Sequence, residues 1–321
     1  MFKRILVPLD GSPRAEQALP VAARLAQASG GSIHILQVIK IVVPYYGGMP
    51  PVLFVPEQSV ETEMAQATNY LNTVAASSVL IGIHTTTEAM IGLPAQSILA
   101  TAESQGVDLI VLCSHGRTGF IRWMLGSVAH TLAHESTIPT LVLPESEPAS
   151  LLSNTDPARP PYALVALDGS EFAEAALIPA AHLVTALAAS APGALHLAQV
   201  VKIFPATAEE GFVSERNEEA VQHARTYLAQ VTERLQTTIQ DLKLSITSSV
   251  ELEKDVSSAL LHLAEHGGEG KEAEGVSRCN LIALSTHGRG GLERWVMGSV
   301  TERLLTSAIV PMLIVRPPKK G

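Results

Sequence analysis

The chain has 321 residues, a formal net charge of −9 and two cysteines; 46% of its residues are apolar and 4% are aromatic. The apolar content excludes a disordered chain. The negative charge and the few aromatic side chains argue against a nucleic-acid surface, which needs basic stripes or stacking platforms. The length allows two domains of ordinary size. The cysteines form no C-x-x-C pattern, which fits a reducing compartment, so we expect a cytoplasmic protein.

The first half is predicted to alternate strands and helices. Its opening strand, 5–9, ends in the sequence Asp10-Gly11-Ser12. Ser12 can cap a helix that begins at Pro13, runs to about Ser29 and ends at two glycines. The further predicted elements are strands at 32–39, 82–88, 108–113 and 139–143, and helices near 59–78, 94–105 and 126–136.

The second half repeats this order. Its opening strand, 162–167, ends in Asp168-Gly169-Ser170. The further predicted elements are strands at 194–201, 244–251, 280–285 and 311–315, and helices near 171–190, 212–240, 255–266 and 298–308. Residues 267–277 have no counterpart in the first half and are predicted to be a surface insertion.

No membrane segment is expected. The apolar run after the basic N-terminus ends at Asp10, which is too early for a signal peptide. Residues 175–201 carry no charged side chain, but Pro192 and Gly193 divide them, so we interpret them as a buried helix followed by a strand.

Alternating strands and helices predict an α/β fold with parallel strands joined by right-handed crossovers. We expect two tandem, doubly wound, five-stranded parallel-sheet domains, at 1–147 and 161–321, joined by a linker rich in Pro, Ser, Asn and Asp at 148–160. Ligands of such sheets bind at the carboxyl ends of the strands where the strand order reverses. A site in each domain is therefore expected where the first and fourth strands end.

The same sequence motif occurs at that place in both halves. Residues 114–128 and 286–300 share H-G-R, a later glycine, R-W and G-S-V at the same offsets, and each copy lies between a strand and a helix. A strand, a glycine-bearing loop and a helix N-terminus together can hold a phosphate. The doubling indicates two copies of one module, each with its own candidate site.

The residue types of each copy fit an adenosine-phosphate ligand. A loop glycine lets the backbone approach the ligand, and the G-S-V that opens the next helix offers N–H groups and a hydroxyl to phosphate oxygens. A strand-end aspartate can accept hydrogen bonds from ribose or base, and a valine can form an apolar wall for a purine. These residues are Gly116, Gly126, Ser127, Val128, Asp10 and Val38 in the first half, and Gly288, Gly298, Ser299, Val300, Asp168 and Val200 in the second.

Simpler interpretations exist for some of these residues. A lone Asp-Gly-Ser is more often turn and cap chemistry, but here it occurs twice beside a doubled glycine loop. His115 and His287 lack a second ligand at metal-binding spacing, so we assign them to loop structure or ligand contact and assign no metal site. Arg117 and Arg289 can reach phosphates or remain solvated. Walker, dinucleotide-fold and nucleophile-elbow motifs are absent from the expected places.

With these residues in view, the chain resembles a tandem universal stress protein, and the resemblance covers both halves nearly end to end. The ATP-binding form of that family carries G-x-x-G, nine residues, then G-[ST]. Gly116, Gly126 and Ser127 match it here, as do Gly288, Gly298 and Ser299. The resemblance implies that Asp10 and Asp168 contact ribose and base, that Val38 and Val200 form the adenine wall, and that Pro8 belongs to the same pocket.

The chain departs from that pattern at its first glycine, which is Cys113 in one half and Ser285 in the other. A side chain there costs roughly 1–2 kcal/mol if the backbone must adopt a positive φ. If the position needs only a small residue, both cysteine and serine are acceptable.

The resemblance implies a stress-response regulator that binds ATP, with or without Mg²⁺, in one or both halves. It also implies that the two halves pair through their last strands within one chain, which leaves room for further dimerisation. A slow ATPase is one alternative, although no water-activating base stands beside Ser127 or Ser299. An interaction scaffold with vestigial pockets is the other.

Overall fold

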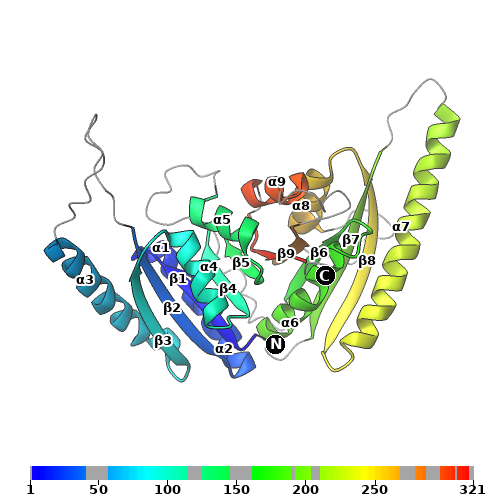
Figure 1. Cartoon of the computed structure of the whole chain (residues 1–321). Coiled ribbons are helices and arrows are strands. Elements are labelled where there is room, and N and C mark those ends of the chain that lie inside the picture. The colour runs from blue at the N-terminus through cyan, green and yellow to red at the C-terminus, as the bar shows by residue number, and fades with distance from the viewer. Residues whose placement is uncertain are drawn as a thin grey trace, which may run out of the picture.

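A computed structural model of the chain describes residues 2–40, 57–114, 125–144, 161–188, 192–203, 210–267, 279–286, 297–307 and 309–317. Within them ten strands form one sheet in the order β3-β2-β1-β4-β5-β10-β9-β6-β7-β8 (Figure 1). The first half contributes β1 (Arg4–Leu9), β2 (Ser32–Ile39), β3 (His84–Ile91), β4 (Leu109–Cys113) and β5 (Thr140–Leu143). The second contributes β6 (Tyr162–Leu167), β7 (Gly193–Lys202), β8 (Leu244–Glu253), β9 (Leu281–Ser285) and β10 (Met312–Val315).

The predicted fold class, α/β with two doubly wound five-stranded halves, is confirmed. Strands within each half are parallel, and the order reverses between β1 and β4 and again between β6 and β9. The halves meet at β5 and β10, which pair antiparallel. Leu141 and Leu313 are Cα partners in this seam and both are fully buried. The seam therefore joins two five-stranded sheets into one, as the resemblance implied.

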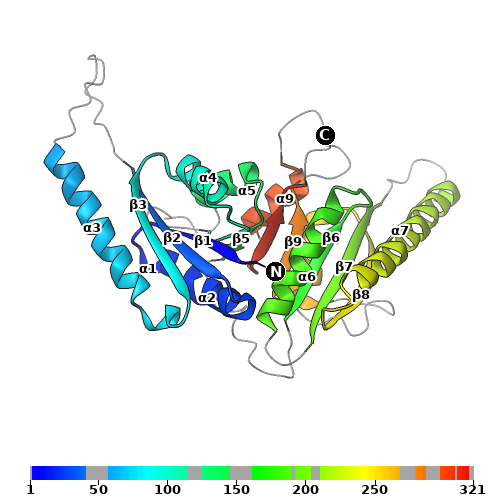
Figure 2. The ribbon, with the colours of Figure 1, turned by 60° about the horizontal axis from the view of Figure 1, so that its bottom comes forward.

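Helices cover both faces of the sheet (Figures 1 and 2). One face packs against α2 (Ala18–Ser29), α3 (Glu57–Ala75), α6 (Leu177–Leu187) and α7 (Glu210–Thr238), and the other against α4 (Pro94–Ser104), α5 (Ser127–Glu135), α8 (Val256–His266) and α9 (Ser299–Ser307). Both hydrophobic clusters contain residues from both halves. The short elements are α1 (Pro13–Glu16) and the 3₁₀ turns η1 (Ser78–Leu80) and η3 (Ala173–Ala176).

The first helix of each half is interrupted, and here the predicted continuous helices are wrong. In the first half α1 ends at Glu16 and α2 begins at Ala18; in the second, η3 precedes α6. A proline explains both breaks. Pro20 cannot donate a hydrogen bond to the carbonyl of Glu16, four residues back, and its ring crowds that carbonyl. Pro179 has the same relation to Ala175.

Two histidines occupy the same place in the two halves with different partners. His34 on β2 contacts Thr86 through Nδ1 at 2.8 Å and Glu88 through Nε2 at 3.2 Å. His196 on β7 contacts Thr247 at 2.8 Å and Ser249 at 2.9 Å. His196 is fully buried, and burial lowers its pKa to about 4. This ring is therefore held neutral inside the fold.

The predicted linker, 148–160, and most of the predicted insertion at 267–277 lie outside the described residues. The uncharged stretch at 175–201 contains α6 and β7, as predicted. Within the described part of the chain, no helix is both long enough and apolar enough to cross a membrane.

Candidate functional sites

The two Asp-Gly-Ser sequences form the same turn at the carboxyl ends of β1 and β6. Asp10 Oδ1 accepts hydrogen bonds from the Ser12 backbone N–H at 3.0 Å and from the Ser12 hydroxyl at 2.6 Å. Asp168 Oδ1 accepts the equivalent bonds from Ser170 at 3.0 and 2.6 Å. Each aspartate is thus fixed in orientation where its strand ends.

The serines of these turns also accept hydrogen bonds from the elements that follow: Ser12 is the N-cap of α1, whereas the N-cap of η3 is Phe172. Ser12 accepts a hydrogen bond from the Ala15 N–H at 3.3 Å, and Ser170 accepts one from the Ala173 N–H at 3.2 Å. The central residues, Gly11 and Gly169, have φ values of 81° and 85°, a region that favours glycine. Cap chemistry is therefore part of what the Asp-Gly-Ser sequences do, and it places both aspartates at the reversal of strand order.

β4 ends beside this turn at Cys113. Its S–H donates to the Ala15 carbonyl at 4.0 Å, and burial, together with the charge of Asp10, raises the pKa of the thiol to about 12. Ser285 ends β9 and is buried; its carbonyl accepts a hydrogen bond from Thr301 at 3.2 Å. No described residue other than glycine has a positive φ, so neither side chain strains the backbone where the resemblance expects glycine.

The two ends of each motif loop are joined by a backbone hydrogen bond. The Gly126 N–H donates to the Ser114 carbonyl at 2.8 Å, and the Gly298 N–H donates to the Thr286 carbonyl at 3.0 Å. Gly126 is the N-cap of α5 and offers no side chain to the first turn. Ser127 and Ser299, the first residues of α5 and α9, are both exposed. The first-turn N–H groups of a helix have no partner inside the helix, and they attract anions.

Six of the predicted residues belong to the loops between these ends. They lie outside the described residues: His115, Gly116, Arg117, His287, Gly288 and Arg289.

The predicted apolar wall lies on the sheet face covered by α4, α5, α8 and α9. Val38 and Val128 pack against the same hydrophobic cluster in the first half, and Val200 and Val300 do so in the second. All four are half-buried. Pro8, two residues before Asp10, follows Leu6 on this face because side chains alternate along a strand. The second half has Ala166 in place of Pro8.

Two glutamines beside the aspartate turns were not predicted. In register, Gln37 pairs with Leu9, and Gln199 pairs with Leu167. Among the described residues, the buried side-chain carbonyl oxygen of each has no hydrogen-bond partner. The internal repeat carried a signal, since a Q-V pair stands at the same offset after His34 and after His196. A ligand that donates hydrogen bonds could satisfy these acceptors.

Taken together, each half places a carboxylate, a buried amide acceptor, an apolar surface and a helix N-terminus around one end of its sheet. The carboxylate and the amide oxygen can accept hydrogen bonds, whereas the helix N-terminus can donate them to an anion. A ligand with a flat apolar group at one end, hydroxyl groups in the middle and a negatively charged group at the other end would use the apolar surface, the carboxylate and the helix N-terminus. A nucleotide is a ligand of this chemical type.

Comparison with known proteins agrees with this architecture. A relative from Mycolicibacterium smegmatis, a universal stress protein, is 27% identical over 98% of this chain and 97% of its own length. The universal stress protein YxiE of Bacillus subtilis is 31% identical over 44% of this chain and 99% of its own length. The crystal structure of a universal stress protein from Archaeoglobus fulgidus covers 98% of both chains with a TM-score of 0.62 at 19% identity.

The sequence model of the Universal stress protein family matches the chain twice, over residues 1–144 and 163–316. The two matches correspond to the two halves of the sheet and include both aspartate turns and both motif loops. Because together they span most of the chain, this protein belongs to the universal stress protein family and carries two copies of its domain.

Proposed function

We propose that each half binds an adenine nucleotide, with ATP as the first candidate, and that binding serves as a conformational signal in a stress response. The observation that carries this proposal is the repeated geometry. Both halves have the same aspartate turn, the same hydrogen bond across the ends of the motif loop and the same pair of valines on one cluster. Cap chemistry alone accounts for the turns but not for the matching loop ends and valines.

In this proposal the phosphates lie at the N-termini of α5 and α9, where Gly126 and Gly298 leave room and Ser127 and Ser299 add hydroxyls. The ribose and base extend toward Asp10 and Asp168. The adenine ring packs on Val38 in the first half and on Val200 in the second. Where Mg²⁺ accompanies the nucleotide, it would neutralise part of the phosphate charge in a protein that is itself acidic.

The residues present fit such a ligand. Gln37 and Gln199 lie on the sheet face opposite Val38 and Val200, because side chains alternate along a strand, so their partnerless buried acceptors are not counted as contacts of a base that packs on those valines. A Cβ added at Gly298 would come no closer than 3.6 Å to its nearest neighbour, the Thr286 carbonyl oxygen. The protein alone therefore tolerates a side chain at Gly298, and the need for glycine there would come from the ligand.

Equilibrium titration of the intact protein with Mg-ATP, ADP, AMP and cyclic AMP tests the proposal. Asn can still accept the bond from the Ser12 N–H but lacks the charge, so Asp10→Asn and Asp168→Asn should each weaken binding in their own half by about tenfold. Asp108→Asn is the matched control. Asp108 directly precedes β4 and accepts hydrogen bonds from the backbone N–H groups of Lys3 and Arg4, at the amino ends of the strands and away from the proposed site. If none of these four nucleotides binds at millimolar concentration, the proposal is wrong.

The proposed setting is a reducing compartment such as the cytoplasm. Burial raises the pKa of both Cys113 and Cys279 to about 12, so both thiols are protonated at neutral pH and neither is poised for redox chemistry. If nucleotide binding failed while partner proteins still bound the intact chain, an interaction scaffold would be the better description.

A further inference from the structure

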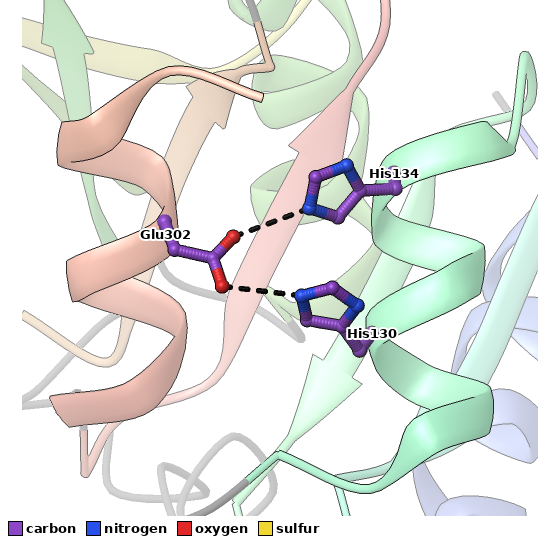
Figure 3. Close-up of side chains that lie close together, drawn as sticks. All are labelled: His130, His134 and Glu302. Carbon is purple, nitrogen blue, oxygen red and sulfur yellow. Dashed lines mark hydrogen bonds and ion pairs between the residues drawn. The ribbon is translucent and has the colours of Figure 1, made fainter. Parts of the chain in front are cut away.

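Three metal-ligating side chains meet where the two halves join. His130 and His134 lie on α5, and Glu302 lies on α9 (Figure 3). His130 Nε2 is 3.1 Å from Glu302 Oε1, and His134 Nε2 is 3.2 Å from Glu302 Oε2. The two imidazole rings have centroids 4.5 Å apart. Figure 3 shows both rings pointing from one helix toward the carboxylate on the other.

The internal repeat explains why these residues meet. His130 stands four residues after Gly126, and Glu302 stands four residues after Gly298, so they occupy equivalent positions in the two halves. The antiparallel pairing of β5 with β10 places α5 beside α9. His134 joins them because residues four apart lie on one face of a helix. The equivalent of His134 in α9 is Thr306, so the cluster holds two histidines and one carboxylate.

We propose that His130, His134 and Glu302 form a binding site for Zn²⁺ that bridges the two halves of the protein. Two imidazole nitrogens and one carboxylate oxygen are a known protein ligand set for zinc, with a fourth position left for water or another ligand. In a tetrahedral site with bonds of about 2.0–2.2 Å, ligand atoms lie about 3.3–3.5 Å apart. Each histidine nitrogen lies 3.1 or 3.2 Å from a different oxygen of Glu302, and one ligand atom from each of the three residues lies within 4.8 Å of the others, so small side-chain movements would bring them to these distances.

The surroundings allow a metal to enter. The side chains of His130, His134 and Glu302 are 43%, 24% and 42% exposed, so an ion can reach them from solvent and a water can complete its coordination.

A second histidine pair provides an internal control. His262 and His266 on α8 have the same four-residue spacing, and their rings stack with centroids 4.8 Å apart. Among the described residues, only the pair His130 and His134 has a third metal-ligating side chain beside it, that of Glu302. If spacing alone sufficed, both pairs would bind zinc equally. The carboxylate from the other half is what distinguishes the seam.

The test is titration of chelator-treated, nucleotide-free intact protein with Zn²⁺ by calorimetry. We expect a site that His130→Ala, His134→Ala and Glu302→Gln each weaken by more than the roughly 10- to 100-fold that loss of an outer-shell partner costs. His262→Ala should leave this site unchanged. Co²⁺ in place of Zn²⁺ should give the visible absorption of a four-coordinate site in the intact protein and in His262→Ala, but not in His130→Ala.

Three results would overturn the proposal. The first is that the intact protein binds no zinc. The second is that His130→Ala, His134→Ala and Glu302→Gln bind zinc as tightly as the intact protein, and the third is that His262→Ala loses as much affinity as they do. Because the three side chains are partly exposed, the variants should fold, and far-ultraviolet circular dichroism verifies this. The titration contains no nucleotide, so its outcome is independent of the proposed nucleotide sites.

Discussion

The backbone N–H of Gly298 donates a 3.0 Å hydrogen bond to the carbonyl of Thr286, and this bond fixes the two ends of the second motif loop. Gly126 and Ser114 make the same bond at 2.8 Å in the first half. Both glycines directly precede a helix. Each loop therefore starts and ends at a defined place beside a helix N-terminus, whatever ligand it holds.

Replacing Gly298 by alanine should separate folding from ligand binding. The new Cβ meets nothing closer than 3.6 Å, and no positive φ is required, so the free energy of unfolding should fall by less than about 1 kcal/mol. Nucleotide affinity in the second half should fall strongly, because the methyl group occupies the approach to the helix N-terminus. Urea denaturation and nucleotide titration of the same variant measure the two effects.

That prediction fails if Gly298→Ala binds nucleotide as well as the parent protein does. It also fails if the variant is destabilised as much as a core variant, because glycine would then serve the fold.

Ser12→Ala should destabilise the protein by roughly 0.5–2 kcal/mol, the usual cost of losing a helix N-cap, and Ser170→Ala should cost less, because Ser170 contacts the first residue of η3 without being its N-cap. Each serine also donates to the neighbouring aspartate, so the orientation of Asp10 or Asp168 loosens as well. The measurement is the midpoint of urea denaturation. Ser12→Thr, which keeps the hydroxyl, should remain close to the parent; a loss equal to that of alanine would show that the cap is not the cause.

The buried neutral His196 predicts a pH dependence of stability. Its folded pKa of about 4 lies below the unfolded value of 6.5, so between these values the unfolded chain binds a proton that the folded protein does not. The free energy of unfolding should fall as pH decreases from about 6.5 to 4, by up to about 3 kcal/mol from this residue. Above pH 6.5 its contribution should be constant.

Subtracting the stability profile of His196→Gln from that of the parent isolates this contribution, because glutamine does not titrate. His34→Gln, at the equivalent place in β2, is the comparison variant. A difference profile for His196→Gln that stays flat from pH 7 to 4 would contradict the assignment.

The seam between β5 and β10 should show energetic coupling. Leu141→Ala and Leu313→Ala should each cost about 2–5 kcal/mol, because both side chains are fully buried. Since the two residues are partners across the seam, the double variant should lose less than the sum of the single losses. The pair Leu141→Ala and Leu195→Ala, on strands far apart in the sheet, should be additive; additivity within about 0.5 kcal/mol for the seam pair would count against direct contact.

Local patterns predicted much of the fold. Alternating strands and helices gave the fold class, and the serine and glycine signals at Ser12 and Gly30 marked helix ends that the structure has. The breaks before Ala18 and Leu177 were readable from Pro20 and Pro179, but the long apolar periodicity on either side favoured continuous helices. Pro20 and Pro179 lie in the interior of the predicted helices, where a proline breaks or kinks a helix, so these two breaks could have been predicted from the sequence.

Contacts between distant segments were beyond the reach of local patterns. The sequence contains the pair His130 and His134, but Glu302 is more than 160 positions away and meets them only because β5 pairs with β10. The partnerless acceptors of Gln37 and Gln199 likewise depend on which groups surround them after folding. The predicted residues at 115–117 and 287–289 lie outside the described residues, so their roles stay predictions.

Calorimetric titration of the intact protein with Mg-ATP, beside the double variant Gly126→Ala and Gly298→Ala, decides whether both halves bind nucleotide at these helix N-termini. We expect two nucleotides bound per chain of the parent and loss of both sites in a variant that remains folded. Absence of heat from the parent at millimolar ATP, or unchanged binding by the double variant, would contradict this expectation.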